Sequence, residues 1–304
     1  MNLDKKSEEA LKQMTHEKEV KVVQDAQVRE NKKELRETVN TKKKDKILVV
    51  YSGGLDSTTA LYLYRHLGYE VEAVSFNYGQ RHSIELEKAG ELCKELEIKH
   101  HIMDVPIPSS NSCLVDLFED VPKGHYEDKT MKKTVVNNRN AIMISLATAL
   151  AIDIKAVGVA VGIHAGDHAI YADCRKKFFM SMNDSMIYAN EGLLENNFRL
   201  RAPFITADKN DIAELAILLD VPVEKTYSDY EGGKVQRGCS GTSVERIEAV
   251  AIGYQRYNTL ISPFKSHHNC DKTEYVDKEF ALNLLIEKRI KERTEEIINT
   301  LNWK

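Results

Sequence analysis

The chain has 304 residues, of which 42% are hydrophobic, and a formal net charge of −4 at pH 7. A chain of this length can bury one large core or two smaller ones, and its weakly negative charge argues against a dedicated nucleic-acid binder. Neither a run of about twenty apolar residues nor a signal-peptide core is evident, so we expect a cytoplasmic protein with no membrane contact.

Residues 1–45 are too polar to supply a hydrophobic core. They contain no glycine, proline or aromatic residue, and lysine and arginine alternate with glutamate and aspartate. Such a composition is typical of a solvated helix, a disordered arm or a segment that stabilises a dimer. We therefore predict a separate charged N-terminal arm, helical or disordered.

The next segment combines a strand with a glycine-rich loop. Residues 47–51 are apolar and rich in β-branched side chains, as in a parallel strand that ends at the carboxyl edge of a sheet. Two adjacent glycines let backbone N–H groups approach an anion, and the hydroxyl residues predict a helix that they cap, from Ser57 onward. The pattern predicts a polyphosphate site formed by Ser52, Gly53, Gly54, Asp56, Ser57 and Thr58.

The loop at 52–59 contains neither the Gly-Lys-Ser/Thr of a Walker motif nor Gly-x-Gly-x-x-Gly. It resembles the loop of the N-type ATP pyrophosphatases, which cleave ATP between its α and β phosphates and use the AMP half to activate an oxygen atom. The resemblance implies that ATP is the ligand. Asp56 would then orient the loop or contact Mg²⁺, which screens phosphate charge in such chemistry.

Strands and helices alternate from residue 46 to residue 165, which predicts a parallel sheet covered on both faces. The predicted strands are 47–51, 71–77, 99–103 and 156–161, and the predicted helices are 57–67, 82–96 and 139–151. Because polar residues follow both of the first two strands, we expect segments 52–59 and 76–82 to meet at the carboxyl edge, where open α/β sheets bind ligands.

The predicted fold class is therefore α/β, a doubly wound parallel sheet of the adenine-nucleotide alpha-hydrolase-like (PP-loop) type with a mostly helical C-terminal part. We divide the chain into the arm at 1–45, an ATP pyrophosphatase domain at 46–225 and a helical region at 226–304. The last region includes a Glu/Lys-rich helix predicted at 276–301.

An ordered series of motifs is similar to the 7-cyano-7-deazaguanine synthase family. The series spans residues 46–254 and comprises 52–59, 76–82, 139–141, 166–175, Lys209, 220–222, 226–228 and 241–246. The resemblance implies ATP-dependent conversion of 7-carboxy-7-deazaguanine, with ammonia, into 7-cyano-7-deazaguanine (preQ0) through an amide. It also implies a homodimer, and the composition predicts no direct contact with nucleic acid.

The resemblance implies two groups of site residues besides the loop. The catalytic group comprises Asp56, Arg139, Arg175 and Lys209. The three cations, together with Arg81, would neutralise charge that develops on phosphorus, while Asp56 would orient the loop or contact Mg²⁺. The substrate-binding group would stack on a flat deazapurine and accept its N–H bonds, and it comprises Phe76, Tyr78, Gln80, Arg81, Asn140, Asp167 and Asp173.

Each of these residues also has a purely structural interpretation. Arg81 could be a surface charge, the two aromatic residues could belong to the core, and the Arg139-Asn140 pair could simply open a helix. His164 and His168 flank a loop, but two histidines with no fixed third ligand are more often structural or substrate contacts than metal ligands.

The largest departure from the family lies at its zinc site, where the family has four cysteines. The corresponding positions here are Asp229, Arg237, Ser240 and Ser243. These side chains form no zinc cage, so we expect no structural zinc and a polar cluster in its place, with Arg237 able to pair with Asp229. A relocated site would need Cys239 together with His267, His268 and Cys270.

These departures leave the product and the pathway open. A variant could stop at the amide, act on a related deazapurine or pass the activated group to another amine, in tRNA, DNA or other modification. A different class is a nucleotide-binding scaffold without turnover, and another is a pyrophosphatase that activates tRNA bases. The unbasic composition and missing sulfur-relay cysteines count against the last, and the intact Ser52, Asp56, Ser57, Arg139 and Lys209 favour an active enzyme.

Overall fold

The computed structural model describes residues 44–108, 112–116, 118–123, 131–233, 236, 238–265, 288 and 291–299. Almost all of the arm lies outside the described residues, as do Arg237, His267, His268 and Cys270. Of the predicted helix 276–301, residues 288 and 291–299 are described, and they are helical. Residues Asp45–Lys304 form one compact unit and Met1–Lys44 another. The division of the larger unit at residue 226 stays a prediction.

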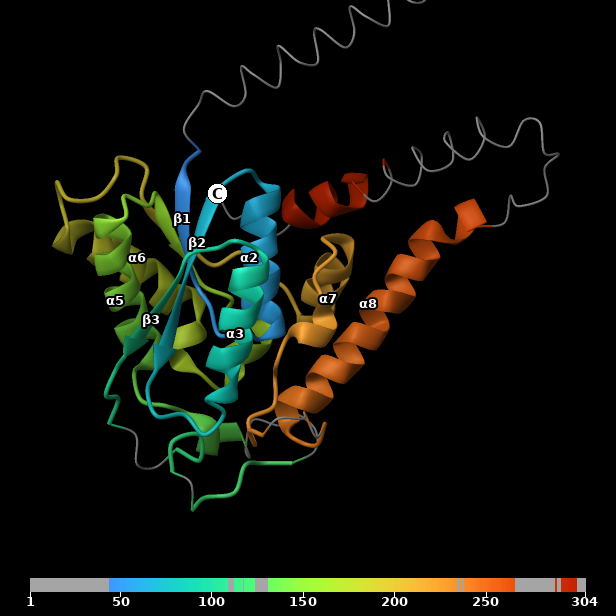
Figure 1. Cartoon of the computed structure of the whole chain (residues 1–304), viewed down its shortest axis with the longest axis horizontal. Coiled ribbons are helices and arrows are strands. Elements are labelled where there is room, and N and C mark those ends of the chain that lie inside the picture. The colour runs from blue at the N-terminus through green and yellow to red at the C-terminus, as the bar shows by residue number, and fades with distance from the viewer. Residues whose placement is uncertain are drawn as a thin grey trace, which may run out of the picture. The chain divides into compact units, whose positions relative to one another are not determined.

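Five parallel strands form one sheet in the order β3-β2-β1-β4-β5 (Figure 1). The strands are β1 Lys46–Val50, β2 Glu70–Asn77, β3 His100–Asp104, β4 Gly158–Ala160 and β5 Arg199–Arg201. The predicted doubly wound parallel sheet is confirmed. Strand β5 was not predicted, because a segment that alternates arginine and leucine over only three residues carries too short a pattern.

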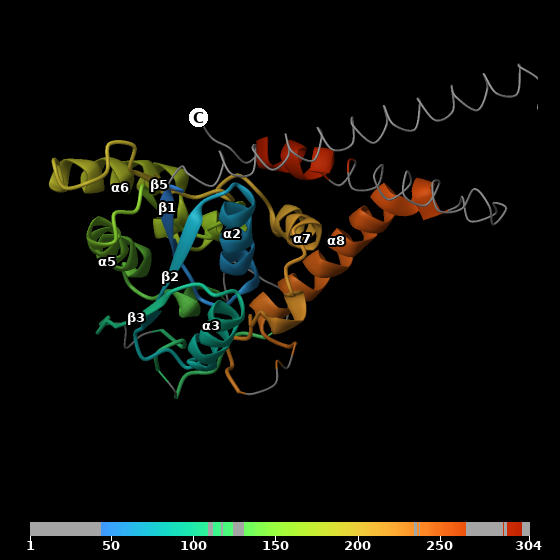
Figure 2. The ribbon, with the colours of Figure 1, turned by 45° about the horizontal axis from the view of Figure 1, so that its top comes forward.

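The main helices are α2 Leu55–His66, α3 Ile84–Glu95, α5 Arg139–Asp153, α6 Lys176–Ala189, α7 Lys209–Leu218 and α8 Gly241–Lys265. They cover both faces of the sheet, because side chains of β1 alternate between two cores. Ile47 and Val49 pack with residues of α2, α3 and α7, whereas Leu48 packs with residues of α5 and α6. Figures 1 and 2 show these two groups of helices on opposite sides of the sheet.

The order of the strands determines where a ligand can bind. Strand β1 pairs with β2 on one side and with β4 on the other, so the winding direction of the chain reverses between β1 and β4. The carboxyl ends of such neighbouring strands leave a crevice that open α/β sheets use for ligands. Here the glycine-rich loop follows β1, and residues 161–164 follow β4.

Residues Lys132–Asp153 contain a helical stretch that is long and apolar enough to span a membrane by length and composition alone. We expected no apolar run long enough to span a membrane, and this stretch meets that criterion. Within this stretch, Met143, Ile144 and Ala147 of α5 are buried in the core against the sheet. A core helix passes the same test, and the absence of membrane contact and the cytoplasmic location stay predictions.

Candidate active site

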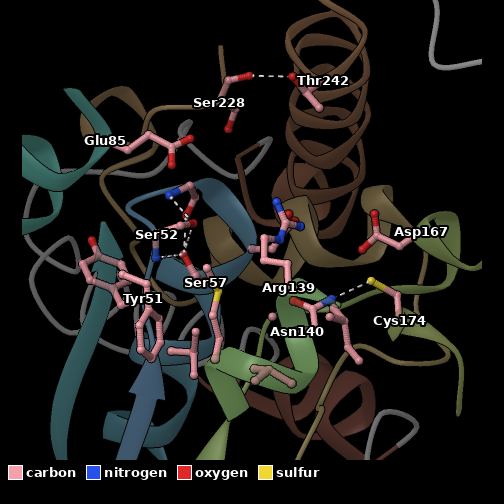
Figure 3. Close-up of a pocket in the computed structure, with 18 of the residues that line it drawn as sticks. Tyr51, Ser52, Ser57, Glu85, Arg139, Asn140, Asp167, Cys174, Ser228 and Thr242 are labelled. Carbon is pink, nitrogen blue, oxygen red and sulfur yellow. Dashed lines mark hydrogen bonds between the residues drawn. The ribbon is translucent and has the colours of Figure 1, made fainter. Parts of the chain in front are cut away.

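A pocket lies at the carboxyl edge of the sheet, beside the ends of β1 and β4 (Figure 3). Its walls combine the loop after β1, the first turns of α3 and α5, the segment after β4 and the N-terminal ends of α7 and α8. Most predicted site residues line it, namely Ser52, Gly54, Asp56, Ser57, Phe76, Tyr78, Gln80, Arg139, Asn140, Asp167 and Lys209. The structure thus brings them together, while their individual roles stay predictions.

The glycine-rich loop turns sharply into α2. Gly53 has a φ of +79°, which only glycine adopts readily, and the N-cap of α2 is Gly54 rather than a hydroxyl residue. The helix therefore begins at Leu55, two positions before the predicted Ser57, and no side chain caps it. An uncapped first turn presents backbone N–H groups and the positive end of the helix dipole, which together suit an anion.

Hydroxyl groups hold the loop in this shape. The Ser52 and Ser57 Oγ atoms are 3.1 Å apart, and the Ser57 Oγ also accepts a hydrogen bond from the Ser52 N–H at 3.2 Å (Figure 3). Thr58 is fully buried and donates its hydroxyl to the carbonyl of Gly54 at 2.7 Å. Thr58 and Gly53 thus shape the loop from behind the pocket wall, whereas Ser52 and Ser57 face the pocket.

Lys209 and Asp56 form an ion pair at the pocket wall. Asp208 caps α7 by accepting from the N–H of Asp211, so the helix begins at Lys209 and its Nζ reaches Asp56 Oδ2 at 2.6 Å. Burial favours a neutral Asp56, but the Lys209 ammonium and His164 outweigh it, so the pKa of Asp56 lies below its usual value. Both groups of the pair are therefore charged at neutral pH.

Arg139 supplies a second cation, which is half-buried in the pocket wall. Asn138 adopts the left-handed conformation with a φ of +55°, which asparagine tolerates better than most residues, and α5 begins at Arg139. The guanidinium faces the hydroxyls of Tyr78, Tyr171 and Tyr230, and no carboxylate of the described residues forms an ion pair with it. A half-buried cation without a carboxylate partner suits an anionic ligand.

Three predicted residues direct their side chains elsewhere. Arg81 donates to the carbonyls of Asp116 and Glu119 at 3.0 and 2.6 Å, and Arg175 donates to the carbonyl of His168 at 2.8 Å. Asp173 accepts from the backbone N–H of Asn140 at 3.0 Å and so supports the start of α5. None of the three lines the pocket among its described residues, and a direct ligand contact for each stays a prediction.

Several residues that line the pocket were not predicted. They are His82, Glu85, His164, Tyr171, Cys174, Tyr227, Ser228, Tyr230, Thr242 and Glu245. His82 and Glu85 are three positions apart at the start of a helix, and this spacing alone is a weak indication of a site. Their burial in the pocket wall, which the sequence does not show, makes them candidates. Glu245 lies 4.0 Å from Lys209 Nζ, and burial raises the pKa of its carboxyl although Lys209 opposes this.

The three described positions of the family zinc site form a hydrogen-bonded cluster. The Ser240 hydroxyl lies 3.0 Å from Asp229 Oδ1 and 2.9 Å from the Ser243 hydroxyl, and all three residues are buried. An aspartate and two serines lack the thiolate and imidazole ligands of a structural zinc site. Across the described residues, no group of three or more histidine, cysteine, aspartate or glutamate side chains is placed to hold a metal ion.

Gly162 is where the segment after β4 presses against the loop. A Cβ at this position would lie 3.0 Å from the Ser57 nitrogen and 3.2 Å from its Cα. We predict that Gly162→Ala displaces the first turn of α2 and lowers the rate of ATP consumption at least ~10-fold, because small displacements of reacting groups are costly. Rate measurements should show this, with Gly90→Ala as control, since a Cβ at that position would meet only the His100 ring, at an ordinary contact distance of 3.8 Å. Equal rates for Gly162→Ala and the wild type would contradict the prediction.

Comparisons with known proteins agree with this geometry. Residues 46–249 match the family model described as "Queuosine biosynthesis protein QueC". The chain is 44% identical to the 7-cyano-7-deazaguanine synthase of Caldicellulosiruptor saccharolyticus, over 66% of this chain and 89% of the relative. It is 39% identical to the enzyme of that name from Pseudoalteromonas translucida, over 72% and 98%. The match to a solved structure of NMN synthetase from Francisella tularensis covers 73% of this chain and 88% of the synthetase chain, with 15% sequence identity and a TM-score of 0.39.

Proposed function

Because the chain belongs to the queuosine biosynthesis protein QueC family, we propose that it converts 7-carboxy-7-deazaguanine, ammonia and ATP into 7-cyano-7-deazaguanine. One observation carries the proposal beyond the family match. The open first turn of α2 and the half-buried cations Lys209 and Arg139 line one pocket. That combination suits the transfer of AMP from ATP to a carboxylate.

In the proposed first step, a carboxylate oxygen of the substrate attacks the α-phosphorus of ATP. The bond from this phosphorus to the bridging oxygen breaks, and pyrophosphate leaves with the electron pair. Ammonia then attacks the acyl carbon, AMP departs with the former carboxylate oxygen, and a proton is lost to give the amide. A carboxylate alone would not react with ammonia, because it is a poor electrophile.

The second step repeats the activation on the amide. The amide oxygen attacks the α-phosphorus of another ATP, and pyrophosphate leaves again. Loss of AMP with that oxygen and of the remaining N–H protons forms the carbon–nitrogen triple bond. Each oxygen of the original carboxylate thus departs on one AMP, and the same residues serve both activations.

The loop and the cations divide this work. Backbone N–H groups of the first turn of α2, with the Ser52 and Ser57 hydroxyls, would hold the departing pyrophosphate. Lys209 and Arg139 would offset the negative charge that develops on the phosphate oxygens. Phe76 and Tyr78, which line the pocket beside them, would stack on a planar ring.

Magnesium fits one feature of the pocket. The Oδ1 atom of Asp56 is buried and has no hydrogen-bond partner in the part of the chain that the structure describes, while Oδ2 accepts from Lys209. An unshared carboxylate oxygen beside a phosphate site is the protein ligand that Mg²⁺ commonly uses. We propose that Asp56 holds Mg²⁺, which when bound would screen the charge of the polyphosphate.

We further propose a homodimer and a C-terminal segment that folds without zinc. The polar cluster of Asp229, Ser240 and Ser243 supports the second proposal, because it fills the ligand positions with hydrogen bonds. The same segment carries Tyr227, Ser228 and Tyr230 in the pocket wall, so its order matters for the site.

The activity is tested by incubating the purified chain with ATP, Mg²⁺, ammonium and 7-carboxy-7-deazaguanine. Mass spectrometry then separates AMP, amide and nitrile, and Asp56→Ala serves as the control. We expect the nitrile, with AMP formed at a ratio of two to one if both activations occur as proposed. Amide alone would show that the reaction stops there. A wild-type chain that binds ATP but releases no AMP would overturn the proposal for this substrate.

A further inference from the structure

Two buried polar side chains at the start of α3 line the pocket but have no place in the scheme above. His82 and Glu85 expose only 2% and 8% of their surface, and both belong to the pocket wall. Figure 3 shows Glu85 in this wall. Helix α3 begins at Ile84, so the two residues lie one turn apart and point to the same side. Polar groups this deeply buried normally have hydrogen-bond partners.

Both residues have unused hydrogen-bonding capacity. The His82 Nδ1 atom has no partner among the described residues, and its Nε2 lies 3.5 Å from Glu85 Oε1. Apart from this contact, the Glu85 carboxyl makes no hydrogen bond or ion pair with any described residue. The His82 ring lies against the Tyr230 ring, with centroids 5.2 Å apart, so its position is fixed. The pair therefore presents oriented polar atoms to whatever enters the pocket.

Burial disfavours the charged form of both groups. Burial raises the pKa of Glu85 well above its usual value, and Arg139 offsets this only in part. Burial, together with Arg139 and Arg81, lowers the pKa of His82 to about 3. The titratable groups that face Glu85 are His82 in the turn before its helix, Tyr78 after β2 and Arg139 on α5.

A neutral carboxyl carries an O–H donor and a C=O acceptor side by side. This pair matches a cyclic amidine edge, in which a ring nitrogen accepts one hydrogen bond and the neighbouring amino group donates the other. The adenine of ATP and the aminopyrimidinone ring of a deazapurine both present such an edge. An ionised carboxylate could only accept, and would favour a different edge.

We propose that Glu85, oriented by His82, binds the cyclic amidine edge of a purine-type ring and so selects a ligand of this pocket. The inference rests on the proposed function and deepens it, because it names a specificity residue that the family resemblance did not supply. It also moves recognition of the ring edge away from Asp173, which instead supports the backbone of Asn140.

The test is isothermal titration of the full chain with α,β-methylene-ATP and, separately, with 7-carboxy-7-deazaguanine. We expect Glu85→Leu to weaken binding of one of the two ligands by about 10-fold or more. Glu85→Gln should stay within about 3-fold of the wild type, because its amide keeps one donor and one acceptor. Glu87→Leu, at an exposed position of the same helix, is the matched control. Thermal unfolding of each variant without ligand checks that the fold is retained.

The outcomes separate the two possible ligands. A loss confined to the ATP analogue would assign the pair to adenine, and a loss confined to the deazapurine would assign it to the substrate. Unchanged affinities in Glu85→Leu, or equal losses in Glu85→Leu and Glu85→Gln, would overturn the proposal while the proposed function survives. A wild-type chain that binds neither ligand would overturn the proposed function, and this inference with it.

Discussion

Lys209→Met should lower the rate of AMP release by about 100- to 1,000-fold while the chain stays folded. The Lys209 ammonium lies 2.6 Å from Asp56 and only 13% of its side chain is exposed, so its charge acts in a poorly screened setting. Methionine keeps the length and apolar body of the side chain but removes the charge that would offset the phosphate oxygens. The measurement is the initial rate of AMP release at saturating ATP.

The control for this prediction must distinguish the loss of a lysine charge in the pocket from the loss of a lysine charge elsewhere on the protein. Lys225 also pairs with a carboxylate, Glu95, but both side chains are about half exposed. Lys225→Met should therefore leave the rate within a factor of about two, since exposed ion pairs contribute little. A Lys209→Met enzyme that releases AMP at the wild-type rate would exclude Lys209 from the chemistry. The double variant Asp56→Asn/Lys209→Met tests whether any loss of stability comes from an unpaired Asp56.

The core of the sheet could be predicted from the sequence because its signals are local. Strands β1 and β2 are apolar runs that end in polar residues, and their predicted bounds differ from the observed ones by one residue. The start of α2 was misplaced, because serines and threonines favour N-caps in general. Here these hydroxyls bond inside the loop, and the two glycines leave the first turn uncapped.

The pocket was harder to predict because it depends on long-range contacts. Asp56 and Lys209 are 153 positions apart, and only the resemblance to a family placed both in one site. Arg81 and Arg139 each stand beside a predicted ligand-binding segment, but Arg81 binds the carbonyls of Asp116 and Glu119. No local pattern distinguishes these two arginines.

His82 and Glu85 illustrate the same difficulty from the other direction. In the sequence they resemble ordinary polar residues at the start of a solvated helix. Both are nevertheless buried, and the ring that packs against His82 is that of Tyr230, almost 150 positions later. Burial then changes the protonation of both groups, which a sequence pattern cannot report.

The protein should unfold at the same temperature with and without a zinc chelator, because we expect no structural zinc. In the same segment, Asp229→Ala should lower the free energy of unfolding by about 1–3 kcal/mol. Asp229 is fully buried, and its Oδ1 accepts from the Ser240 hydroxyl at 3.0 Å and from the Glu231 N–H at 3.1 Å. Alanine would remove the shared acceptor of both hydrogen bonds from a buried cluster. Urea unfolding of both proteins, with Asp120→Ala at an exposed position as control, measures the difference.

A hydrogen-bonded cluster and a metal site also respond differently to single substitutions. The Ser240 hydroxyl contacts Asp229, Thr242 and Ser243, whereas the Ser243 hydroxyl contacts Ser240 and, at 3.3 Å, the carbonyl of Ser228. Ser240→Ala should therefore cost more stability than Ser243→Ala. Stoichiometric zinc in the purified chain, with destabilisation by the chelator, would contradict the prediction. Cys239→Ser and Cys270→Ser would then show whether those thiols bind the ion, because a structural zinc site that loses one ligand is damaged as a whole.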